Sequence, residues 1–428
     1  MKITLPEFCL VLLIGVSGSG KSTFARAHFR PSEVLSSDAC RAWIADDEND
    51  QSVTRDAFEV LNIIAAKRLA NLRLTVIDAT NVQPEARRPL LALARQYHCI
   101  PMAIVFDLPE QVCLERDQAR PNRHVGSLVI SRQRQQLHQS LSTLKDEGFR
   151  RIYVLKSAQE VAEVSIVRQP LACNRRHETG PFDIIGDVHG YLDALLRLLA
   201  KLGYRLEPDA DTYQVTPPAG RTAIFVGDLV NHGPQSAQVL RLVMAMVAAH
   251  TAKCVPGDHD VQLLRALQGK PGPQRPELSI TLAQLEDAGA AFNQQVADFI
   301  LSLASHYVLD EGRLVVAHAG LPAELQGRIS DTVRAFALFG ETRNVSNRPG
   351  TQPPRWVVRY RGRARVVYGH TPLPRAEWIN RTINLDTGCA FGGALTALRY
   401  PEGELVSVPA VDSAPSREGT EKGGDAPL

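Results

Sequence analysis

The sequence predicts two α/β domains that follow one another along the chain. Short apolar runs alternate with helical patterns from residue 9 to residue 157, a polar stretch at 168–181 interrupts them, and a strand pattern restarts at 182. A chain of 428 residues is long enough for two separate hydrophobic cores. We therefore expect domains at 1–165 and 182–408, a linker at 166–181 and a disordered polar tail at 409–428.

The first domain has the pattern of a parallel sheet covered by helices on both faces. Regular alternation of strands and helices gives this three-layer arrangement, because each helix returns the chain to the edge where the next strand starts. The predicted strands are 9–15, 34–38, 74–78, 100–107 and 151–157, and the predicted helices are 21–29, 52–72, 83–98, 109–120 and 127–146.

The second domain starts with a strand at 182–186 and contains a long insert at 261–310. The insert is predicted to be mostly helical, with a Pro/Gly-rich loop at 269–276. Further strands are predicted at 222–226, 252–255, 313–317, 364–368 and 382–385.

The overall composition is that of a globular protein and argues against a disulfide-rich or membrane-spanning chain. Charged residues make up 22% and hydrophobic residues 44%, as in ordinary globular proteins, and a net charge of +2 gives no general basic field. Seven cysteines without a C-x-x-C pair fit a reducing cytoplasm better than a disulfide framework. No apolar stretch approaches the roughly 18 residues of a membrane span, so we expect no membrane contact.

Residues 15–22 form the pattern G-x-x-x-x-G-K-S between a predicted strand and a predicted helix. Glycines let successive backbone N–H groups point at one phosphate, and the helix N-terminus favours the anion. In this pattern Lys21 reaches the β- and γ-phosphates of ATP, and Ser22 ligates Mg²⁺. The alternative is a purely structural glycine turn. The predicted ATP-binding residues are Gly15, Ser17, Gly18, Ser19, Gly20, Lys21, Ser22 and Thr23.

Two charged residues near the second predicted strand are candidates for the acceptor side of a phosphoryl transfer. Asp38 ends that strand at the carboxyl edge of the sheet, where a carboxylate can take the proton of an acceptor hydroxyl. Arg41 lies one helical turn further on and can clamp a phosphate of the acceptor. Asp is also a common helix N-cap, so this structural role stays open for Asp38.

Three arginines at positions 116, 120 and 123 have the spacing i, i+4, i+7 and would share one face of a helix. An arginine face near the phosphates can stabilise the transferring group as a lid. A solvated basic helix is the usual interpretation of such a run when no phosphate site is nearby. Asp78, which ends the third predicted strand, can orient Mg²⁺ or its water, or can belong to a turn.

The ordered set GVSGSGKS, SSDACR, VIDATN and RDQARPNRHVGSLVI resembles the kinase module of bacterial polynucleotide kinase–phosphatases of RNA repair. The resemblance covers residues 9–160. It implies that Asp38 is the general base, that Arg41 binds the acceptor, and that Arg116 and Arg123 belong to the lid over the donor phosphates. The implied acceptor is a 5′-hydroxyl end of RNA or DNA, with RNA favoured.

In the second half, Asp and His residues follow one predicted strand after another. Mixed carboxylate and imidazole ligands suit a pair of divalent ions such as Mn²⁺, Ni²⁺, Fe or Zn²⁺, of which we expect Mn²⁺ or Ni²⁺. Two such ions about 4 Å apart can hold a phosphate and generate the attacking hydroxide. A lone histidine is more often a core residue, but five segments in order make that interpretation improbable. The predicted metal ligands are Asp187, His189, Asp228, Asp258, His318 and His370.

The order D-x-H-G, G-D, G-x-H, H and G-H over 182–408 resembles the calcineurin-like metallophosphoesterases. The ending INLDTGCAFGGALTALRYP is similar to the phosphatase half of the same RNA-repair proteins, and to related diadenosine tetraphosphate hydrolases and protein phosphatases. The resemblance implies an α/β/β/α sandwich with His259 as the catalytic histidine.

Three positions depart from the pattern of that family. Asn231 and His232 stand where G-D-x-x-D-R-G has Asp and Arg, and Asp258 stands where G-N-H has Asn. Asp258 keeps an oxygen ligand but adds negative charge, His232 cannot copy the two-pronged grip of Arg, and Asn231 would contact His259 without charge. Since the loss of one polar contact can cost about 10²–10³ in rate, we hypothesise a domain that binds metal but hydrolyses phosphate poorly or prefers an altered substrate.

Together these features predict an ATP-dependent polynucleotide 5′-kinase fused to a metal-dependent phosphatase for 3′- or 2′-phosphates. One alternative is a small-molecule P-loop kinase fused to a nucleotide or protein phosphatase, and another is a non-catalytic nucleotide-gated binding protein. No lysine-containing ligase segment follows the phosphatase pattern, so an RNA ligase acting in trans is the partner expected by analogy. A homodimer stays open.

Overall fold

The computed structural model describes residues 1–120, 124–210, 212–270, 275–341 and 353–411. The chain separates into two compact units, one of Met1–Asn174 with Gly327–Arg334 and one of Arg175–Gln326 with Ala335–Leu428. The division between the units after Asn174 falls within the predicted linker at 166–181, which contains most of β7 (Ser165–Gln169) and all of β8 (Asn174–Arg175). In the described part of the chain, no helix has the length and apolar character to cross a membrane.

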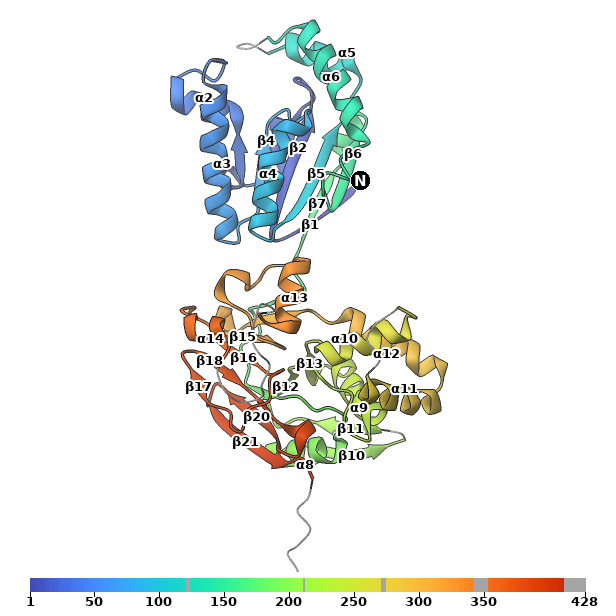
Figure 1. Ribbon diagram of the computed structural model, residues 1–428. Helices are drawn as coiled ribbons and strands as arrows, with labels where there is room; N and C mark the ends of the chain where they lie inside the picture. Colours follow the sequence, from blue (N-terminus) through green and yellow to red (C-terminus); the bar gives the residue numbers. More distant parts are fainter. Residues whose placement is uncertain (121–123, 211, 271–274, 342–352, 412–428) are drawn as a thin grey trace, which may run out of the picture. The chain divides into compact units, whose positions relative to one another are not determined.

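The first unit is built on five parallel strands in the order β3-β4-β2-β5-β6, which confirms the predicted parallel sheet (Figure 1). The central strand is apolar along its whole length and fully buried, because helices cover both faces of the sheet. Alternate residues of this strand enter two apolar cores, with Leu12 on one side and Leu13 on the other. The strands are β2 (Cys9–Gly15), β3 (Val34–Ser36), β4 (Thr75–Asp78), β5 (Ile100–Phe106) and β6 (Arg151–Leu155).

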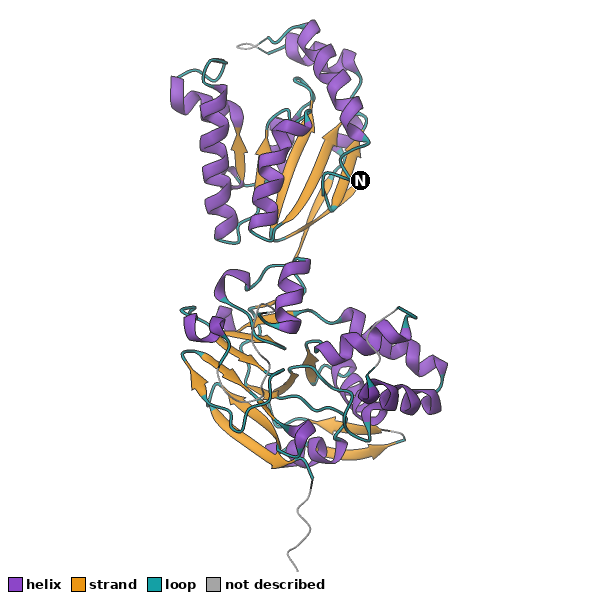
Figure 2. Ribbon diagram, viewed as in Figure 1, coloured by secondary structure: helices purple, strands orange, loops and turns teal. Residues whose placement is uncertain are grey.

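A helix follows each strand of this sheet (Figure 2), and the five predicted helices are found as α1, α3, α4, α5 and α6 close to their predicted positions. Two helices and two strands of this unit lie outside the predictions: the helices α2 and α7, and the strand β1 (Lys2–Pro6) with its parallel partner β7. The α5–α6 pair and α2 stand at opposite sides of the carboxyl edge of the sheet (Figure 1). The helices are α1 (Lys21–His28), α2 (Ser37–Ala45), α3 (Thr54–Ala70), α4 (Pro84–Gln96), α5 (Glu110–Gln118), α6 (Ser127–Leu141) and α7 (Ala158–Ala162).

The second unit contains two six-stranded sheets and a separate hairpin of β10 (Arg205–Asp209) and β11 (Thr212–Thr216). One sheet has the order β13-β12-β9-β20-β19 with β21 on β20, and the other has the order β17-β18-β16-β15-β14-β8. The strands of the first are β9 (Phe182–Ile185), β12 (Thr222–Phe225), β13 (Ala252–Cys254), β19 (Asp386–Thr387), β20 (Ala394–Tyr400) and β21 (Glu404–Pro409). Those of the second, besides β8, are β14 (His306–Leu309), β15 (Leu314–Ala317), β16 (Arg365–Tyr368), β17 (Trp378–Ile379) and β18 (Thr382–Asn384).

The two sheets face one another across an apolar core to which both contribute, for example Ile184 and Ile224 from one and Val316 and Val367 from the other. A second core lies between the first sheet and its helices. The helices of this unit are α8 (Leu192–Leu202), α9 (Ser236–Ala248), α10 (Asp258–Leu267), α11 (Pro276–Ala288), α12 (Ala290–Ser302), α14 (Arg355–Arg359) and the part of α13 (Asp331–Phe339) from Ala335 on. Among the described residues, the predicted insert contains most of α10 and all of α11 and α12, which ends at Ser302, and its last residues form β14. Of the loop predicted at 269–276, residues 271–274 lie outside the described residues, and Pro276 already begins α11.

Two further predictions concern the end of the chain and the cysteines. Pro409 is not in a tail, because it closes β21, and the next residue, Ala410, is buried with its N–H bonded to the carbonyl of Gly393 at 2.9 Å. Residues 412–428, the rest of the predicted tail, lie outside the described residues. All seven cysteines are buried, and none of them is in a disulfide bond.

Candidate functional site

The loop between β2 and α1 has a backbone that only glycines permit. Gly20 caps α1 with a φ of 94°, and Gly18 has a φ of 79°. A β-carbon on Gly18 would lie 2.2 Å from the carbonyl oxygen of Cys113 in α5. The glycines of the predicted phosphate-binding loop are therefore required by the close approach of α5 as well as by the turn itself.

Lys21 turns its side chain back over this loop. Its Nζ donates to the carbonyl oxygens of Gly15 and Val16, each at 2.8 Å. Burial lowers the pKa of Lys21 to about 8, against the charge of Asp78, which raises it. The hydroxyl of Ser22 is hydrogen-bonded to the carboxylate of Asp78.

Lysine, serine and carboxylate thus meet at the carboxyl ends of β2 and β4, as a nucleotide–Mg²⁺ site requires. The buried hydroxyls of Ser17 and Ser19 lie in the same loop. Thr23 differs from the other predicted ATP-binding residues, because it lies exposed on α1.

Asp38 lies in the first turn of α2, so the prediction that it ends a strand is wrong. β3 stops at Ser36, whose hydroxyl accepts a hydrogen bond from the N–H of Ala39 and caps the helix. The N-cap role considered for Asp38 therefore belongs to Ser36. The side chain of Asp38 is 38% exposed, and its charge acts on both Lys21 and Asp78, which places it at the same edge of the sheet as the loop.

Arg41 is buried, with only 4% of its side chain exposed. Its guanidinium forms an ion pair with Asp38, and its Nε donates to the carbonyl of Glu48 at 2.8 Å. In this arrangement Arg41 fixes the carboxylate of Asp38, and its contact with an acceptor phosphate stays a prediction.

α5 ends at Gln118, so the three arginines do not share one helical face as predicted. Arg116 lies on the helix, and a β-carbon added to Gly20 would come within 3.2 Å of its Nη1. Arg120 lies beyond the helix, although its charge still lowers the pKa of Lys21. Arg123 lies outside the described residues. One predicted lid arginine is therefore beside the loop, and a second is close enough to act on its lysine.

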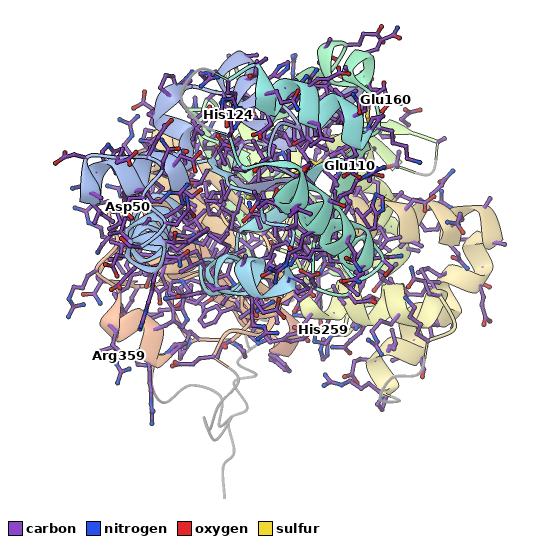
Figure 3. The ribbon with its side chains drawn as sticks, turned by 90° about the horizontal axis from the view of Figure 1, so that it is seen from above. Asp50, Glu110, His124, Glu160, His259 and Arg359 are labelled. Atoms are coloured by element: carbon purple, nitrogen blue, oxygen red, sulfur yellow. The ribbon has the colours of Figure 1, made fainter. Side chains whose placement is uncertain are left out.

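Asp117 holds the chain between α5 and α6. One of its carboxylate oxygens accepts the N–H groups of Val125 and Gly126 at 3.0 and 3.2 Å. Its carbonyl oxygen lies 2.8 Å from Nδ1 of His124, which Figure 3 labels. From α6, the side-chain oxygen of Gln133 accepts the N–H of Ser17 at 2.8 Å, so both helices contact the phosphate-binding loop.

In the second unit, the predicted metal ligands from both sheets come together. Two groups have ligand atoms within 4.8 Å of one another: Asp187, His189 and Asp228 form one, and Asp228, Asp258, His318 and His370 form the other. Asp228 belongs to both groups. A carboxylate shared by two adjacent groups is the arrangement that allows two divalent ions to be bridged.

The backbone around these ligands is strained. His189, Asp228, Asn231, His232 and His370 all have φ values between 49° and 74°, a region that residues other than glycine rarely adopt. Glycines supply the room: a β-carbon on Gly257 would lie 2.0 Å from Oδ1 of Asp228, and one on Gly369 would lie 1.9 Å from Oδ1 of Asp187. Left-handed residues of this kind cluster at functional sites, where the surrounding fold supports the strain.

The chemistry of the ligands fits divalent cations. Oδ1 of Asp187 is buried and has no hydrogen-bond partner among the described residues, while Oδ2 accepts the N–H of His370 at 2.8 Å. Burial and the neighbouring carboxylates raise the pKa values of Asp187 and Asp228 well above their usual range. Cations held by these groups would satisfy the unpaired oxygen and remove the repulsion.

Asp258 lies among the ligands as the sequence predicted. Its Oδ1 lies 3.0 Å from Nδ1 of His370 and 3.4 Å from Nε2 of His318, and its Oδ2 accepts from Gln262 at 2.9 Å. Although burial opposes ionisation, the hydrogen bonds with His318 and His370 hold the pKa of Asp258 well below its usual range. Position 258 therefore presents an anionic ligand.

Asn231 contacts His259, the predicted catalytic histidine. Nδ2 of Asn231 lies 2.7 Å from Nδ1 of His259, and Oδ1 accepts the hydroxyl of Thr281 at 2.8 Å. Because the amide donates, Nδ1 of His259 must accept, and the neutral ring carries its proton on Nε2. Burial lowers the pKa of His259 to about 4, against the charge of Asp258, which raises it.

His232 forms a cluster with His189 and His259, whose ring centroids lie 5.0 to 5.3 Å apart. Their nitrogens make a third group within ligand distance of one another. On the outer side, the ring of Phe391 lies 5.5 Å from that of His232 and is 69% exposed. The position predicted to lose an arginine is therefore occupied by an imidazole with an exposed aromatic ring beside it.

Residues of the helical insert support the cluster of His189, His232 and His259. The sequence did not predict this support. From α11, Thr281 bonds Asn231, and Oε1 of Gln284 accepts the N–H of Ser236 at 2.7 Å. Arg275, just before α11, lowers the pKa values of His232 and His259 through its charge, after the larger effect of burial. None of these residues shows a periodic signal in the sequence, because their role depends on contacts with a loop about 50 residues away.

Asp386 is a further acid that was missed as a site residue, although it lies in the quoted segment INLDTG. It is buried, and its charge is the largest neighbouring contribution, after burial, to the raised pKa of Asp187. Its Oδ1 accepts the N–H of Gly388 at 3.0 Å. Asp386 directly follows the strand predicted at 382–385, so the rule that identified the other ligands could have found it.

Comparison with known proteins supports the interpretation of both halves of the chain as α/β domains that act on phosphates. The family model for AAA domains matches residues 10–144, and the one for calcineurin-like phosphoesterases matches residues 180–405. The chain is 41% identical over 233 residues to the asymmetrical bis(5′-nucleosyl)-tetraphosphatase PrpE of Anoxybacillus flavithermus, covering 53% of this chain and 94% of the relative. It is 38% identical to the protein of the same name from Bacillus subtilis, with coverages of 53% and 94%.

The first unit is thus a P-loop kinase-like domain, and the fold class predicted for both halves is confirmed. The match to the second model spans more than half of the sequence and contains every predicted metal ligand. This chain belongs to the calcineurin-like phosphoesterase family.

Proposed function

We propose that this protein repairs the ends of nucleic acids, with a 5′-hydroxyl kinase in its first unit and a phosphatase for 3′- or 2′-phosphates in its second. The observation that carries the proposal is the grouping of Lys21, Ser22, Asp78 and Asp38 at one sheet edge, on the same chain as a two-metal phosphoesterase site. A protein that carries both activities can prepare both ends of a broken strand, because one end needs a phosphate added and the other needs a phosphate removed. RNA is the favoured substrate, with a separate ligase joining the healed ends.

In the kinase, Asp38 takes the proton of the 5′-hydroxyl while the oxygen attacks the γ-phosphorus of ATP and ADP leaves. Arg41 holds the carboxylate of Asp38 through their ion pair. Lys21 and Arg116 stabilise the negative charge on the phosphates, and Ser22 with Asp78 would hold Mg²⁺, which supplies further charge neutralisation when bound. The buried, free cysteines suit a cytoplasmic location.

Transfer of labelled γ-phosphate from ATP to a 5′-hydroxyl oligonucleotide tests this assignment. We expect Asp38→Asn to lower the rate about 10²–10⁴-fold at nearly unchanged ATP affinity, because general-base catalysis contributes that much. Glu59→Gln, which neutralises an exposed acid on α3, is the matched control. Failure with RNA and DNA, alongside transfer to a small metabolite, would replace the polynucleotide kinase with a small-molecule kinase.

In the phosphatase, Asp187, His189, Asp228, Asp258, His318 and His370 would hold two divalent cations, which polarise the phosphate and the attacking water when bound. His259 would protonate the leaving oxygen as the phosphorus–oxygen bond breaks. We propose that Asn231, His232 and Asp258 slow this step, since none reproduces the charge of the family's usual residue. If the wild type with Mn²⁺ hydrolyses a generic phosphoester as fast as Asn231→Asp/His232→Arg/Asp258→Asn, these substitutions do not weaken the site.

A second candidate substrate is a dinucleoside tetraphosphate, as in the names of the curated relatives. The exposed ring of Phe391 beside His232 favours it, because a nucleobase can stack there while the phosphates reach the ligands. Phe391→Ala should then raise KM for a dinucleoside tetraphosphate about tenfold and leave a chromogenic phosphoester unaffected. Hydrolysis of 3′-phosphorylated RNA but not of dinucleoside tetraphosphates would leave end healing as the better assignment.

A further inference from the structure

An arginine-lined pocket lies at the edge of the second unit's sheet that is remote from the metal ligands. β15, β16 and β18 run parallel, so their first residues share one edge and their last residues the other. Arg365 begins β16, whereas His370 follows its end, and five residues of extended chain span roughly 17 Å. Arg313 and Arg381 immediately precede β15 and β18 at the same edge.

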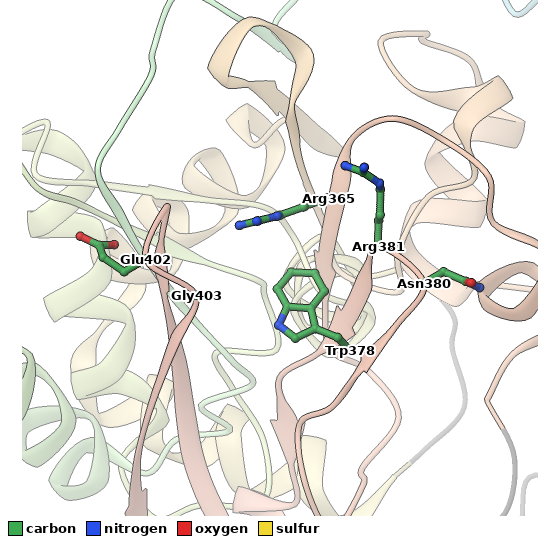
Figure 4. Close-up of a pocket in the computed structure, with 6 residues that line it drawn as sticks. All are labelled: Arg365, Trp378, Asn380, Arg381, Glu402 and Gly403. Carbon is green, nitrogen blue, oxygen red and sulfur yellow. The ribbon is translucent and has the colours of Figure 1, made fainter.

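The pocket consists of two adjoining cavities of about 420 and 440 Å³, both lined by Arg365 and Arg381. Figure 4 shows the first cavity, with the two arginines beside the indole of Trp378 and with Glu402 opposite, on the β20–β21 hairpin. Arg363 and Arg313 extend the basic lining into the second cavity. The lining residues all belong to the second unit.

The positive charge of this pocket is not neutralised by its acids. Asp310 is engaged by Arg313 at 2.6 Å and by the hydroxyl of Tyr400, and Glu402 is paired with Arg221 at 2.8 Å. Arg363, Arg365 and Arg381 have no ion pair with a carboxylate in the described part of the chain. Exposed guanidinium groups in this state attract phosphates.

An aromatic ring lies among these charges. Trp378 is 38% exposed on the edge strand β17, and Cζ of Arg365 lies 5.7 Å from its ring centroid. The same guanidinium lies 5.9 Å from the ring centroid of the buried Tyr400, so it is close to two aromatic rings. A ring that accepts a base next to arginines that accept phosphates is the recognition chemistry of single-stranded nucleic acids.

We propose that this pocket binds a stretch of single-stranded nucleic acid away from the reactive end, with phosphates on Arg363, Arg365 and Arg381 and a base on Trp378. Two adjoining cavities that share Arg365 and Arg381 offer room for neighbouring nucleotides of a strand. The choice of nucleic acid as the ligand rests on the proposed function. The site itself rests on the charge and aromatic lining alone.

A circular single-stranded RNA of about 12 nucleotides tests the pocket separately from both active sites, because it has no ends to be phosphorylated or dephosphorylated. Binding is followed by fluorescence anisotropy at several salt concentrations, with the full-length protein. We expect Trp378→Ala to weaken binding about 5- to 150-fold, the range found when base–aromatic stacking is removed. Trp378→Phe should retain most of the affinity.

Replacing Arg365 and Arg381 together by alanine should lower the slope of log affinity against log salt by about 1.4, since each phosphate contact on a single strand contributes roughly 0.7. Arg205→Ala, on the exposed β10–β11 hairpin, is the matched charge control and should change neither affinity nor slope beyond a small shift. Melting temperatures of all variants show whether they remain folded.

Three results would overturn the proposal. The first is equal binding of the circle by wild type, Trp378→Ala and the double arginine variant, and the second is no binding by any of the three proteins. The third is complete displacement of the circle by inorganic triphosphate at equimolar phosphate, with no effect of Trp378→Ala, which would indicate a small-anion site. If the circle binds as expected while a linear 5′-hydroxyl strand receives no phosphate, the pocket stands and the proposed kinase activity fails.

Discussion

Asn231→Asp gives the sharpest test of how the phosphoesterase site is tuned. The present amide donates to Nδ1 of His259 over 2.7 Å, so protonation of that nitrogen would set two donors against each other. A carboxylate of the same shape would accept from Nδ1–H, and its second oxygen would keep the hydroxyl of Thr281 at 2.8 Å. Asn231 already has a φ of 72°, a conformation that Asp also tolerates.

The expected gain follows from the change in this one contact. A hydrogen bond to a charged group contributes about 1.5–3 kcal/mol. If it acts on the protonated imidazole during departure of the leaving group, the rate rises about 10- to 150-fold. The assay is Mn²⁺-dependent hydrolysis of a chromogenic phosphoester, with metal content measured for each variant.

The control is the pair Asn231→Asp/His259→Ala, in which no imidazole is left to benefit. Equal rates for wild type and Asn231→Asp at equal metal content would refute the argument, as would a gain that persists without His259. A gain confined to the histidine-containing background assigns the effect to the contact between the two residues.

Three further perturbations test other parts of the structure. Gly257→Ala should reduce metal content and destabilise the protein by about 1–3 kcal/mol, because its β-carbon would lie 2.0 Å from Oδ1 of Asp228, and metal analysis with thermal unfolding would show both effects. Chelation of divalent ions should lower the unfolding temperature, since Asp187 and Asp228 then repel; an unchanged temperature would argue against bound metal in that preparation. ATP should bind about tenfold more weakly at pH 9 than at pH 7, because burial sets the pKa of free Lys21 at about 8 and the phosphates favour its charged form. Calorimetry in buffers of different ionisation enthalpy should show proton uptake at pH 9, and Lys21→Met should abolish it.

The predicted sheet of the first unit follows from burial on both faces. The run Cys9–Gly15 has no polar side chain, and a strand between two helical layers must be apolar throughout. β1 and β7 gave no comparable signal, because each has a partially exposed face and its partner lies 163 residues away. Pairing over that distance depends on the finished fold and not on local pattern.

The error at Asp38 has a local cause. The strand predicted at 34–38 extends the apolar run from Val34 to the acid, although Ser36 with an acid in the following turn also fits a helix start. Because Ser36 caps α2, Asp38 lies in the first turn of the helix and Arg41 lies one turn further along it. Asp38, the candidate base, still lies at the carboxyl edge of the sheet. Its place in the helix also gives it an ion pair with Arg41, which a residue at the end of a strand would not have.

The metal ligands and the groups around the substrate differ in how far the sequence predicts them. Each ligand follows a strand or opens a helix, so a local pattern marks its place. Thr281, Gln284 and Arg275 reach the site from the insert, where no periodicity distinguishes them from other helical residues. The departures at Asn231 and His232 lie where these insert residues make contact, so the loop and α11 form one polar unit. Exchanging Asn231 alone therefore tests a single contact of that unit, whereas a full restoration of the family pattern must also accommodate Thr281 and Arg275.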